Sequence, residues 1–525
     1  MKTLIDKIKE GEKLLQQGGG EAGLERQKRL QRMSARERVA ALIDKKSTFL
    51  ELGLWAAYEM YQEWGGLPAA GAITGIGTVQ GRSCMIIAND ATVKAGAMFP
   101  QSVKKVLRAQ RIAYQCRLPI LYLVDSSGVF LPLQDEIFPD EDDFGRIFRN
   151  NSVLSACGIP QFAAIMGNCI AGGGYLPVLC DKLLMTKGSG LYLAGPALVK
   201  AAIGQVIDTE ELGGAEMHAS ISGTVDFLEE NDIACLERLR SLVDLLPSEE
   251  SSAIKNKPQP EIYKIVSADN SKPYDIHSLL DILVDKGSLQ EYKREYGKSL
   301  VTAFATIEGE KVGILANQRI PVKTGRGEIE IGGVIYAESA DKAARFVMDC
   351  NQMKLPLLFL QDVVGFMVGR EAEQSGIIRS GAKLVNAISN SIVPKITVII
   401  GNSFGAGNYA LCGKAYDPAF VFAWPNAKYA VMGAEQASDT LLDIKVKTAE
   451  RNGKPLTEAE RKALKDDIVG RYQTQTDIRY AAARGWIDAI IDPAETRTII
   501  GQALRLVKRA PLPEKASFHT GVIQV

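Results

Sequence analysis

The chain has 525 residues, with 62 basic and 62 acidic side chains and an apolar share of 46%, which is typical of a globular protein of two-domain size. Because there is no excess of positive charge, nucleic-acid binding is not expected. No apolar run approaches the roughly 18 residues of a membrane span. Only 3 histidines are present, and the 8 cysteines form no CxxC pair. This pattern disfavours a site built on several histidines or a metal and indicates reduced thiols.

The first 60 residues are predicted to be helical, with an interruption at the three glycines 18–20. A capping-box sequence from Ser34 to Glu37 begins a helix that should end near Ile43. The N-terminal residues mix acidic and basic side chains and contain no apolar core, so they resemble neither a signal peptide nor a transit peptide. We therefore expect a cytoplasmic protein.

The most informative feature is an internal repeat. Residues 117–125, RLPILYLVD, recur as KLPLLFLQD at 354–362, 237 positions later. Residues 160–175, PQFAAIMGNCIAGGGY, align without a gap on 394–409, PKITVIIGNSFGAGNY, at an offset of 234. Before these segments each copy has a strand-like run, at 84–88 or 312–316, and an amphipathic helix. The agreement of the two offsets indicates two copies of one long α/β unit.

The boundary between the copies is expected near residue 260. Residues 248–264 are polar, contain prolines and show no periodicity, as is typical of a linker. The sequence thus predicts one domain over residues 1–260 and a second over 261–525. Within the second, residues 437–484 are rich in charges at helical spacing and predict a protruding helical pair.

Each copy contains a glycine-rich turn with catalytic potential. A buried strand, at 162–166 or 396–400, is expected to stop at Gly-Asn and to lead through the turn into a helix that begins near Tyr175 or Tyr409. Such a turn leaves backbone N–H groups unpaired near the positive end of a helix, which suits an oxyanion. Glycine-rich turns also serve for packing alone, but the occurrence of the turn in both copies favours the oxyanion hypothesis. Neither copy has the spacing of a phosphate-binding loop.

With these turns, several motifs in a fixed order make the chain resemble the carboxyltransferase (beta) subunit of biotin-dependent acyl-CoA carboxylases, and most closely the methylcrotonoyl-CoA carboxylase branch. The motifs are IANDATVK at 87–94, LVDS at 123–126, QDE at 134–136, FGRIF at 144–148, LAGP at 193–196, LGGA at 212–215, GFMVGRE at 365–371 and WPN at 424–426. The resemblance covers nearly the whole chain.

The resemblance implies two tandem crotonase-like (ββα spiral) domains in a homo-oligomer, expected to be a hexamer, with active sites between subunits. It implies a CoA thioester as substrate, no metal, and a role in leucine degradation. Biotin would be carried by a partner chain, the biotin carboxylase or biotin carrier subunit. Carboxybiotin supplies the carboxyl group, and the freed ureido nitrogen acts as the base.

The same resemblance assigns roles to individual residues. Gly172 and Gly173 would stabilise the thioester enolate, and Ala406 and Gly407, with Gly405 alongside, would stabilise the ureido oxygen of biotin. The expected acyl-CoA contacts are Lys94, Gly96, Met98, Lys105, Arg108, Arg111 and Phe130, together with Gly333 and Phe366. The alternative for the four basic residues is a solvated helix face.

Three further features have simpler interpretations. We expect His218 to order a loop by hydrogen bonding rather than to transfer a proton. The acidic residues in 135–143 are expected to form an exposed loop, because they lack the alternating ligand pattern of a calcium site. The string QMKL at 352–355 resembles a biotinylation motif only faintly and abuts a buried strand, so biotin should be carried elsewhere.

Departures from the family pattern bear on the substrate. Residues 95–100 and 127–130 differ from the methylcrotonoyl branch and make the lining more apolar at Met98 and Phe130. An insertion at 319–332 has a length similar to one in the alpha subunit of sodium-pumping glutaconyl-CoA decarboxylase. We expect carboxylation of a short or branched, α,β-unsaturated acyl-CoA. The alternatives are a glutaconyl-CoA-type decarboxylase subunit, a non-catalytic CoA-binding paralogue and a crotonase-like hydratase. The hydratase is disfavoured because no glutamate accompanies either turn.

Overall fold

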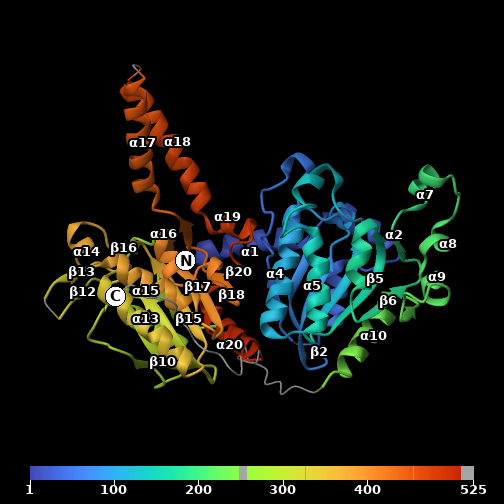
Figure 1. Cartoon of the computed structure of the whole chain (residues 1–525), viewed down its shortest axis with the longest axis horizontal. Coiled ribbons are helices and arrows are strands. Elements are labelled where there is room, and N and C mark those ends of the chain that lie inside the picture. Colours follow the sequence, from blue (N-terminus) through green and yellow to red (C-terminus); the bar gives the residue numbers. More distant parts are fainter. Residues whose placement is uncertain (46, 248–256, 326, 453–454, 510–525) are drawn as a thin grey trace. The chain divides into compact units, whose positions relative to one another are not determined.

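The computed structural model shows two compact units, each of mixed α/β structure (Figure 1). It describes residues 1–45, 47–247, 257–325, 327–452 and 455–509. The N-terminal unit comprises Lys9–Ala253 and Ala482–Gly485, and the C-terminal unit comprises Met1–Ile8, Ile254–Ala481 and Trp486–Val525. The units thus interleave along the chain, whereas the sequence predicts a single boundary near residue 260.

Three helices precede the first sheet, namely α1 (Lys2–Gln16), α2 (Gly20–Arg29) and α3 (Ala35–Leu42). The break between α1 and α2 lies at the predicted glycines. The capping box of α3 is confirmed, because the Ser34 hydroxyl accepts from the Glu37 N–H and the Glu37 carboxylate accepts from the Ser34 N–H. These bonds satisfy donors that the first turn of a helix leaves free.

The N-terminal unit is built on one sheet that contains eight strands among the described residues, in the order β1-β2-β3-β4-β5-β6-β8, with β7 also paired to β5. The strands are β1 (Leu50–Leu52), β2 (Ala72–Val79), β3 (Arg82–Asn89), β4 (Ile120–Ser126), β5 (Gln161–Ile170), β6 (Lys182–Thr186), β7 (Gly190–Tyr192) and β8 (Phe227–Glu229). From β3 onward the strands run parallel, and β4 and β5 consist almost entirely of buried residues. Such runs are typical of a sheet covered on both faces.

The C-terminal unit repeats this sheet in the order β20-β18-β17-β15-β11-β10-β9, with β19 also paired to β17. The strands are β9 (Gln290–Glu291), β10 (Leu300–Ile307), β11 (Glu310–Asn317), β15 (Leu357–Val363), β17 (Lys395–Phe404), β18 (Phe420–Ala423), β19 (Lys428–Ala430) and β20 (Ala489–Ile490). Each hairpin, crossover and short late strand of one sheet has a counterpart in the other. The internal repeat predicted from sequence is therefore confirmed.

The longer helices of the two units also correspond. They are α4 (Pro100–Cys116), α5 (Phe144–Ala156) and α10 (Asp232–Asp244) in the N-terminal unit, and α13 (Ala337–Gln352), α15 (Ile377–Ser389) and α20 (Thr496–Val507) in the C-terminal unit. The shorter helices are α6 (Tyr175–Val178), α7 (Pro196–Ile203), α8 (Thr209–Gly213), α9 (Ala215–Ser220), α11 (Ile262–Ile265), α12 (Ile276–Leu283), α14 (Arg370–Gln374), α16 (Gly405–Ala410) and α19 (Ile478–Ala483).

The central strands β5 and β17 run further than the sequence suggests. Both were expected to stop at Gly-Asn, but they continue to Ile170 and Phe404 because each takes a new partner, β7 or β19, for its last residues. The pairing register also breaks there. Between β4 and β5 it jumps from Val124↔Ile165 to Ser126↔Cys169, and between β15 and β17 from Gln361↔Ile399 to Val363↔Ser403. The Gly-Asn positions are thus bulges inside long strands.

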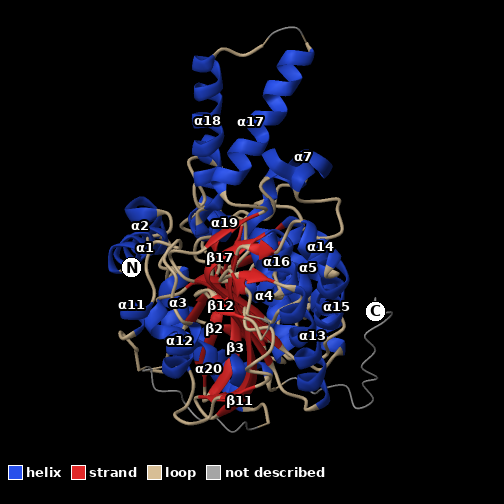
Figure 2. Ribbon diagram, turned by 90° about the vertical axis from the view of Figure 1, so that its left-hand side faces the viewer, coloured by secondary structure: helices blue, strands red, loops and turns tan. Residues whose placement is uncertain are grey.

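The C-terminal unit has two additions. The insertion at 319–332 forms a hairpin of β12 (Val322–Lys323) and β13 (Ile329–Glu330), and β14 (Val334–Ile335) then pairs with β16 (Gly365–Phe366). Helices α17 (Ala434–Arg451) and α18 (Glu458–Thr476) form the predicted helical pair and project from the rest of the unit (Figure 2). No helix among the described residues is long and apolar enough to cross a membrane.

Candidate active site

The two glycine-rich turns have related but unequal structures. In the first, residues Ala171–Gly174 form a single 3₁₀ turn, and helix α6 begins at Tyr175 as predicted. In the second, α16 begins at Gly405, four residues earlier than predicted. Gly405 permits this start because its φ is +53° and a Cβ on it would lie 2.8 Å from the Val431 carbonyl oxygen. Ala406 and Gly407 therefore lie inside the first helical turn.

The backbone N–H groups of these turns are suitable donors to an anion. Neither α6 nor α16 has a side-chain cap at its N-terminus. In α16 the first-turn N–H groups, including those of Ala406 and Gly407, precede any possible i−4 acceptor within the helix. Ala406 is exposed, whereas Gly407 is buried. The second turn thus presents uncapped donors at a surface position, as the oxyanion hypothesis requires.

Each turn packs against the loop that follows the neighbouring central strand. A Cβ on Gly173 would lie 3.7 Å from the Gly128 Cα, and a Cβ on Gly407 would lie 3.4 Å from the Gly365 Cα and 2.5 Å from the Val363 side chain. The first distance is an ordinary contact, whereas the last admits only glycine. Gly172 belongs to the same 3₁₀ turn as Gly173.

Gly96 and Gly333 occupy matching places beside the central strands. Gly96 has φ of +69° and Gly333 has φ of +78°; a Cβ on them would lie 2.1 Å from the Asp125 carbonyl oxygen and 3.1 Å from the Asp362 carbonyl oxygen, respectively. Both positions combine a left-handed backbone with a close approach to another strand, which glycine tolerates best. Each predicted glycine therefore lies against the strand end next to a turn.

The structure brings Met98 and Phe130 to the first turn. The Met98 N–H donates to the Gly128 carbonyl, and the Phe130 N–H donates to the Met98 carbonyl, so the two segments run side by side. Phe130 stacks on Phe99 with ring centroids 4.1 Å apart, and Trp64 meets Phe130 edge-on at 5.1 Å. Because Gly128 also contacts Gly173, this apolar surface adjoins the predicted thioester site.

The four basic residues that were predicted to contact acyl-CoA differ in their exposure. Lys94 and Arg111 are exposed, and Arg108 is half-buried. Lys105 instead lies inside the unit, where its Nζ donates to the carbonyls of Ala69 at 2.9 Å and Ala72 at 2.5 Å. Burial lowers the pKa of this ammonium to about 7. Lys105 therefore binds the backbone that leads into β2, and its charge does not face solvent.

His218 orders its loop, as predicted. Its Nε2 lies 2.8 Å from the Leu191 carbonyl and its Nδ1 lies 2.9 Å from the Ser222 hydroxyl. Because a carbonyl only accepts, the network assigns the proton to Nε2. The acidic segment 135–143 is largely exposed. Phe366 is half-buried and faces α15, where a Cβ on Gly381 would lie 3.0 Å from its ring.

Sequence reasoning gave no role to a buried ion pair behind each turn. In the N-terminal unit, Asp125 accepts from Arg38 at 3.2 Å, and in the C-terminal unit Asp362 lies 3.1 Å from the Arg319 Nε. All four side chains are buried. Burial raises the pKa of both Asp125 and Asp362, and the facing guanidinium opposes that rise. The available signal was that both repeated Leu-Pro strands end in aspartate.

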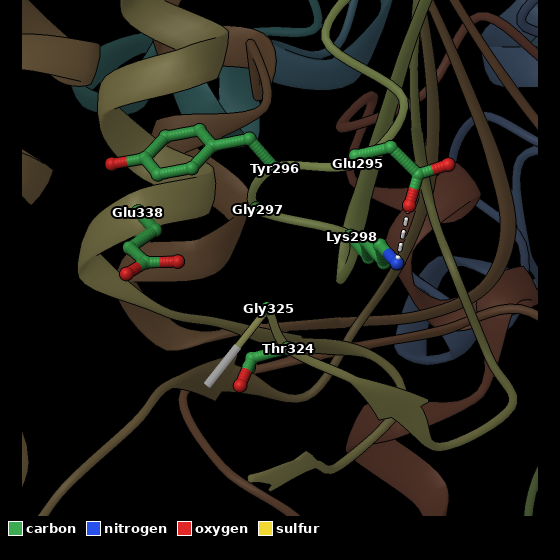
Figure 3. A pocket seen from close by; sticks show the side chains of 7 residues that line it. All are labelled: Glu295, Tyr296, Gly297, Lys298, Thr324, Gly325 and Glu338. Atoms are coloured by element: carbon green, nitrogen blue, oxygen red, sulfur yellow. Dashed lines mark ion pairs between the residues drawn. The ribbon is translucent and has the colours of Figure 1, made fainter. Parts of the chain in front are cut away.

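A separate polar cavity of about 220 Å³ lies in the C-terminal unit (Figure 3). It is lined by Glu295, Tyr296, Gly297, Lys298, Thr324, Gly325 and Glu338. Lys298 and Glu295 form an ion pair of 2.8 Å at its edge, and Glu338 reaches it from α13. None of the predicted site residues lines this cavity, so the candidate site consists of the two turns and their surroundings.

Comparisons with known proteins identify the family of this chain. The sequence pattern of the carboxyl transferase domain family matches residues 26–521. The chain belongs to this family. It is 46% identical over 505 residues to the biotin-dependent 3-methylcrotonyl-coenzyme A carboxylase beta1 subunit of Mycobacterium tuberculosis, which covers 95% of this chain and 92% of the relative. It is 42% identical to the mitochondrial methylcrotonoyl-CoA carboxylase beta chain of Arabidopsis thaliana, with 98% of this chain and 87% of the relative covered.

A comparison with a solved structure confirms the fold of this chain. The crystal structure of the geranyl-CoA carboxylase beta subunit from P. aeruginosa superposes with a TM-score of 0.86 at 33% identity, covering 98% of this chain and 95% of the other. The tandem crotonase-like fold expected from the resemblance is therefore confirmed, as is the assignment to the carboxyltransferase components of biotin-dependent acyl-CoA carboxylases.

Proposed function

We propose that this chain transfers the carboxyl group of carboxybiotin to a short, branched, α,β-unsaturated acyl-CoA of the 3-methylcrotonoyl type. The observation that carries the proposal is the uncapped glycine-rich turn, present once in each unit, in a chain that matches the family over nearly its full length. Two turns suit a reaction in which two oxygens gain negative charge, one on the thioester and one on the biotin ureido group.

The first turn would stabilise the acyl-CoA enolate. Gly172 and Gly173 would donate N–H groups to the thioester oxygen as the neighbouring carbon loses its proton. The adjoining segments, with Gly96, Met98 and Phe130, would surround the acyl chain, since they meet the turn at Gly128. Removing a single donor from such a site typically lowers the rate by roughly 10²–10³.

The second turn would stabilise the ureido oxygen of biotin. Gly405, Ala406 and Gly407 begin α16, and the positive end of that helix adds to their N–H groups. The fit to a ureido group rests on the exposure of Ala406 and on the absence of a side-chain cap at this helix. Biotin supplies the carboxyl group and the base, so this chain contributes orientation and backbone donors.

The acyl pocket should prefer a compact apolar chain. Met98 is 4% exposed, and the stacked pair Phe99 and Phe130 closes the surface beside it. The 3-methylcrotonyl and geranyl names of the compared carboxylases refer to branched, unsaturated acyl groups of different length. We propose that replacing Phe130 by alanine would shift preference toward longer branched acyl groups, because it removes the ring that covers Phe99. Gly333, Phe366, Lys94, Arg108 and Arg111 remain proposed acyl-CoA contacts.

The proposed partner is a biotin-bearing subunit with an ATP-dependent carboxylase domain. We also propose a homo-oligomer, expected to be a hexamer, in which the two turns that serve one reaction come from neighbouring subunits. A cytoplasmic location and a role in leucine degradation stay predictions.

The test uses the full chain with its biotin-bearing subunit and a panel of acyl-CoA thioesters. Gly173→Val and Ala406→Val should abolish transfer while leaving the oligomer intact, because a Cβ at Gly173 has an ordinary 3.7 Å contact and Ala406 is exposed. Gly470→Val in α18 is the control, since a Cβ there meets nothing within 4 Å. Full activity in either turn variant would exclude the proposed site. Decarboxylation without carboxylation would instead favour the glutaconyl-CoA-type alternative.

A further inference from the structure

The strand ends that lead into the two turns are shaped by an aspartate. Asp125 in β4 and Asp362 in β15 each lie at the point where the register with the next strand breaks. Opposite each aspartate, the longer strand carries three residues in place of one, namely 166–168 in β5 and 400–402 in β17. A bulge of this kind changes the direction of the strand that contains it. In both units the strand enters the turn four residues after the central glycine of its bulge.

Each carboxylate fills the inside of its bulge. A Cβ on Gly167 would lie 2.0 Å from the Asp125 carboxylate, and a Cβ on Gly401 would lie 2.3 Å from the Asp362 carboxyl carbon. The following N–H donates to the same carboxylate, from Asn168 at 3.3 Å and from Asn402 at 2.9 Å. The repeated Gly-Asn pair is thereby explained, because the glycine admits the carboxylate and the asparagine N–H binds it.

A buried arginine orients each carboxylate. Arg38 donates to Asp125 at 3.2 Å and also to the Met166 carbonyl at 2.8 Å, so it holds the aspartate and the bulge together. Its Nε binds a second carboxylate, Asp232, at 2.8 Å. In the other unit Arg319 comes from the insertion, and its Nη2 donates to the Asn270 carbonyl at 2.7 Å. The Tyr274 hydroxyl also donates to Asp362, at 3.1 Å.

We propose that Asp125 and Asp362 are positioning residues that fix the strand ends so that the turn N–H groups point at the reacting oxygens. The inference rests on the proposed function of the turns. Neither aspartate is placed to touch substrate. The backbone carbonyl of each aspartate also lies against a neighbouring segment, at Gly96 or Gly333. Displacement of catalytic groups by about 1 Å lowers a rate by roughly 10²-fold.

An amide cannot replace either carboxylate in this role. Asparagine has one acceptor oxygen, whereas the aspartate uses one oxygen for the asparagine N–H and the other for the guanidinium. In Asp125→Asn or Asp362→Asn the amide NH₂ would face the arginine, so the side chain rotates and one of the two contacts is lost. The volume stays the same, so the space beside Gly167 or Gly401 remains filled.

The experiment measures kcat and KM for acyl-CoA in the full chain assembled with its biotin-bearing subunit. For Asp125→Asn we expect kcat to fall about 10²-fold, while KM changes less than about two-fold because the turn acts mainly in the transition state. The matched control is Asp232→Asn, which alters the same Arg38, while Asp232 also accepts the Met33 N–H, away from the turn. Its kcat should stay within about three-fold of wild type.

The same design applies to Asp362→Asn. Its control is Asp488→Asn. Asp488 is a buried carboxylate that accepts the Val421 N–H at 2.8 Å and pairs with Lys414 at 2.8 Å. It lies beside the start of β17 rather than beside the turn that follows β17. If Asp362→Asn does not fold, the double variant Arg319→Met, Asp362→Asn removes both charges and should restore the thermal midpoint. Its kcat should nevertheless stay about 10²-fold low, because the guanidinium that orients the wild-type carboxylate is then missing.

Several results would overturn the inference. Equal losses of kcat in an aspartate variant and its control would show a general effect of removing a buried charge. If the loss of kcat equals the loss of folded protein measured by circular dichroism, the role of the aspartate is purely structural. The same conclusion would follow if the double variant regained both its thermal midpoint and its kcat. A wild-type protein without carboxyl transfer would refute the proposed function instead, so the two failures are distinguishable.

Discussion

The N-terminal and C-terminal units share one arrangement of strand and turn, but different side chains hold it in place. Both place a glycine-rich turn beyond a bulged central strand, and both hold the bulge with a buried aspartate and arginine. In the N-terminal unit Arg38 is shared by two carboxylates, Asp125 and Asp232, whereas in the C-terminal unit Asp362 is the one carboxylate paired with Arg319 among the described residues. The difference shows that the strand bulge before the turn is kept while the charge balance behind it varies.

The first prediction tests this difference between Arg38 and Arg319. Asp125→Asn leaves Arg38 paired with Asp232, so its unfolding free energy should fall by only about 1–2 kcal/mol. Asp362→Asn leaves the Arg319 guanidinium buried without an anionic partner among its described contacts, and should cost about 3–5 kcal/mol. Hydrogen exchange of peptides from β5 and β17 measures each unit separately. Equal destabilisation of the two units would contradict the contrast.

The second prediction concerns two lysines at equivalent places in the repeat. Lys105 of α4 donates to two carbonyls, whereas the Nζ of Lys342 of α13, which is also buried, has no hydrogen-bond partner among the described residues. Burial lowers the pKa of Lys342 to about 8. Lys105→Met should destabilise its unit by about 1–3 kcal/mol, since it removes the ammonium that donates to two buried carbonyls. Lys342→Met should be neutral or stabilising.

Urea unfolding of the two lysine variants, followed by the same unit-specific exchange, checks this expectation. The proteins should be compared at one pH, because both ammonium groups have lowered pKa values. A large loss of stability in Lys342→Met would reveal a partner for that ammonium and would remove the asymmetry between the units.

The smallest expected effect is the pH dependence of a histidine ion pair in the C-terminal unit. Arg36 pairs with Glu51 at 3.0 Å, and the equivalent pair in the second copy is His277 with Glu291 at 3.1 Å. The hydrogen bond that His277 donates to Glu291, with a second donated to Asp275, raises the pKa of His277 from 6.5 to about 9 against the effect of burial. The contribution of protonated His277 to the stability of its unit is therefore complete below pH 6.5 and is lost as the pH rises to about 9.

The magnitude should be about 1 kcal/mol, because solvent screens this partly exposed pair. Unfolding measured between pH 6 and pH 9.5 should show the loss in the C-terminal unit, while the Arg36 pair keeps its charge. His277→Gln should flatten the dependence, and Arg36→His should add a comparable dependence to the N-terminal unit. A slope that persists in His277→Gln would assign the effect to another group.

The sequence predicted much of this site because its signals are local or repeated. The two copies of the Leu-Pro strand and of the glycine-rich turn identified the sheet and the two candidate anion sites, and the capping box identified α3. It missed the continuation of β5 and β17 past Gly-Asn, because the new partners β7 and β19 lie 20 or more residues further along the chain. It also placed Lys105 among the acyl-CoA contacts, since spacing alone does not show which side of α4 faces the backbone of residues 69–72.

By itself, the sequence determined the family, the duplicated α/β architecture and the identity of the turn residues, because motif order and periodicity are properties of the chain. Only the tertiary structure showed how Asp125 and Asp362 fit into the bulges, and that Arg38 and Arg319 reach them from unrelated segments. The physical reason is that a buried carboxylate needs a cation and an N–H donor in space, and residues far apart in the chain supply them equally well.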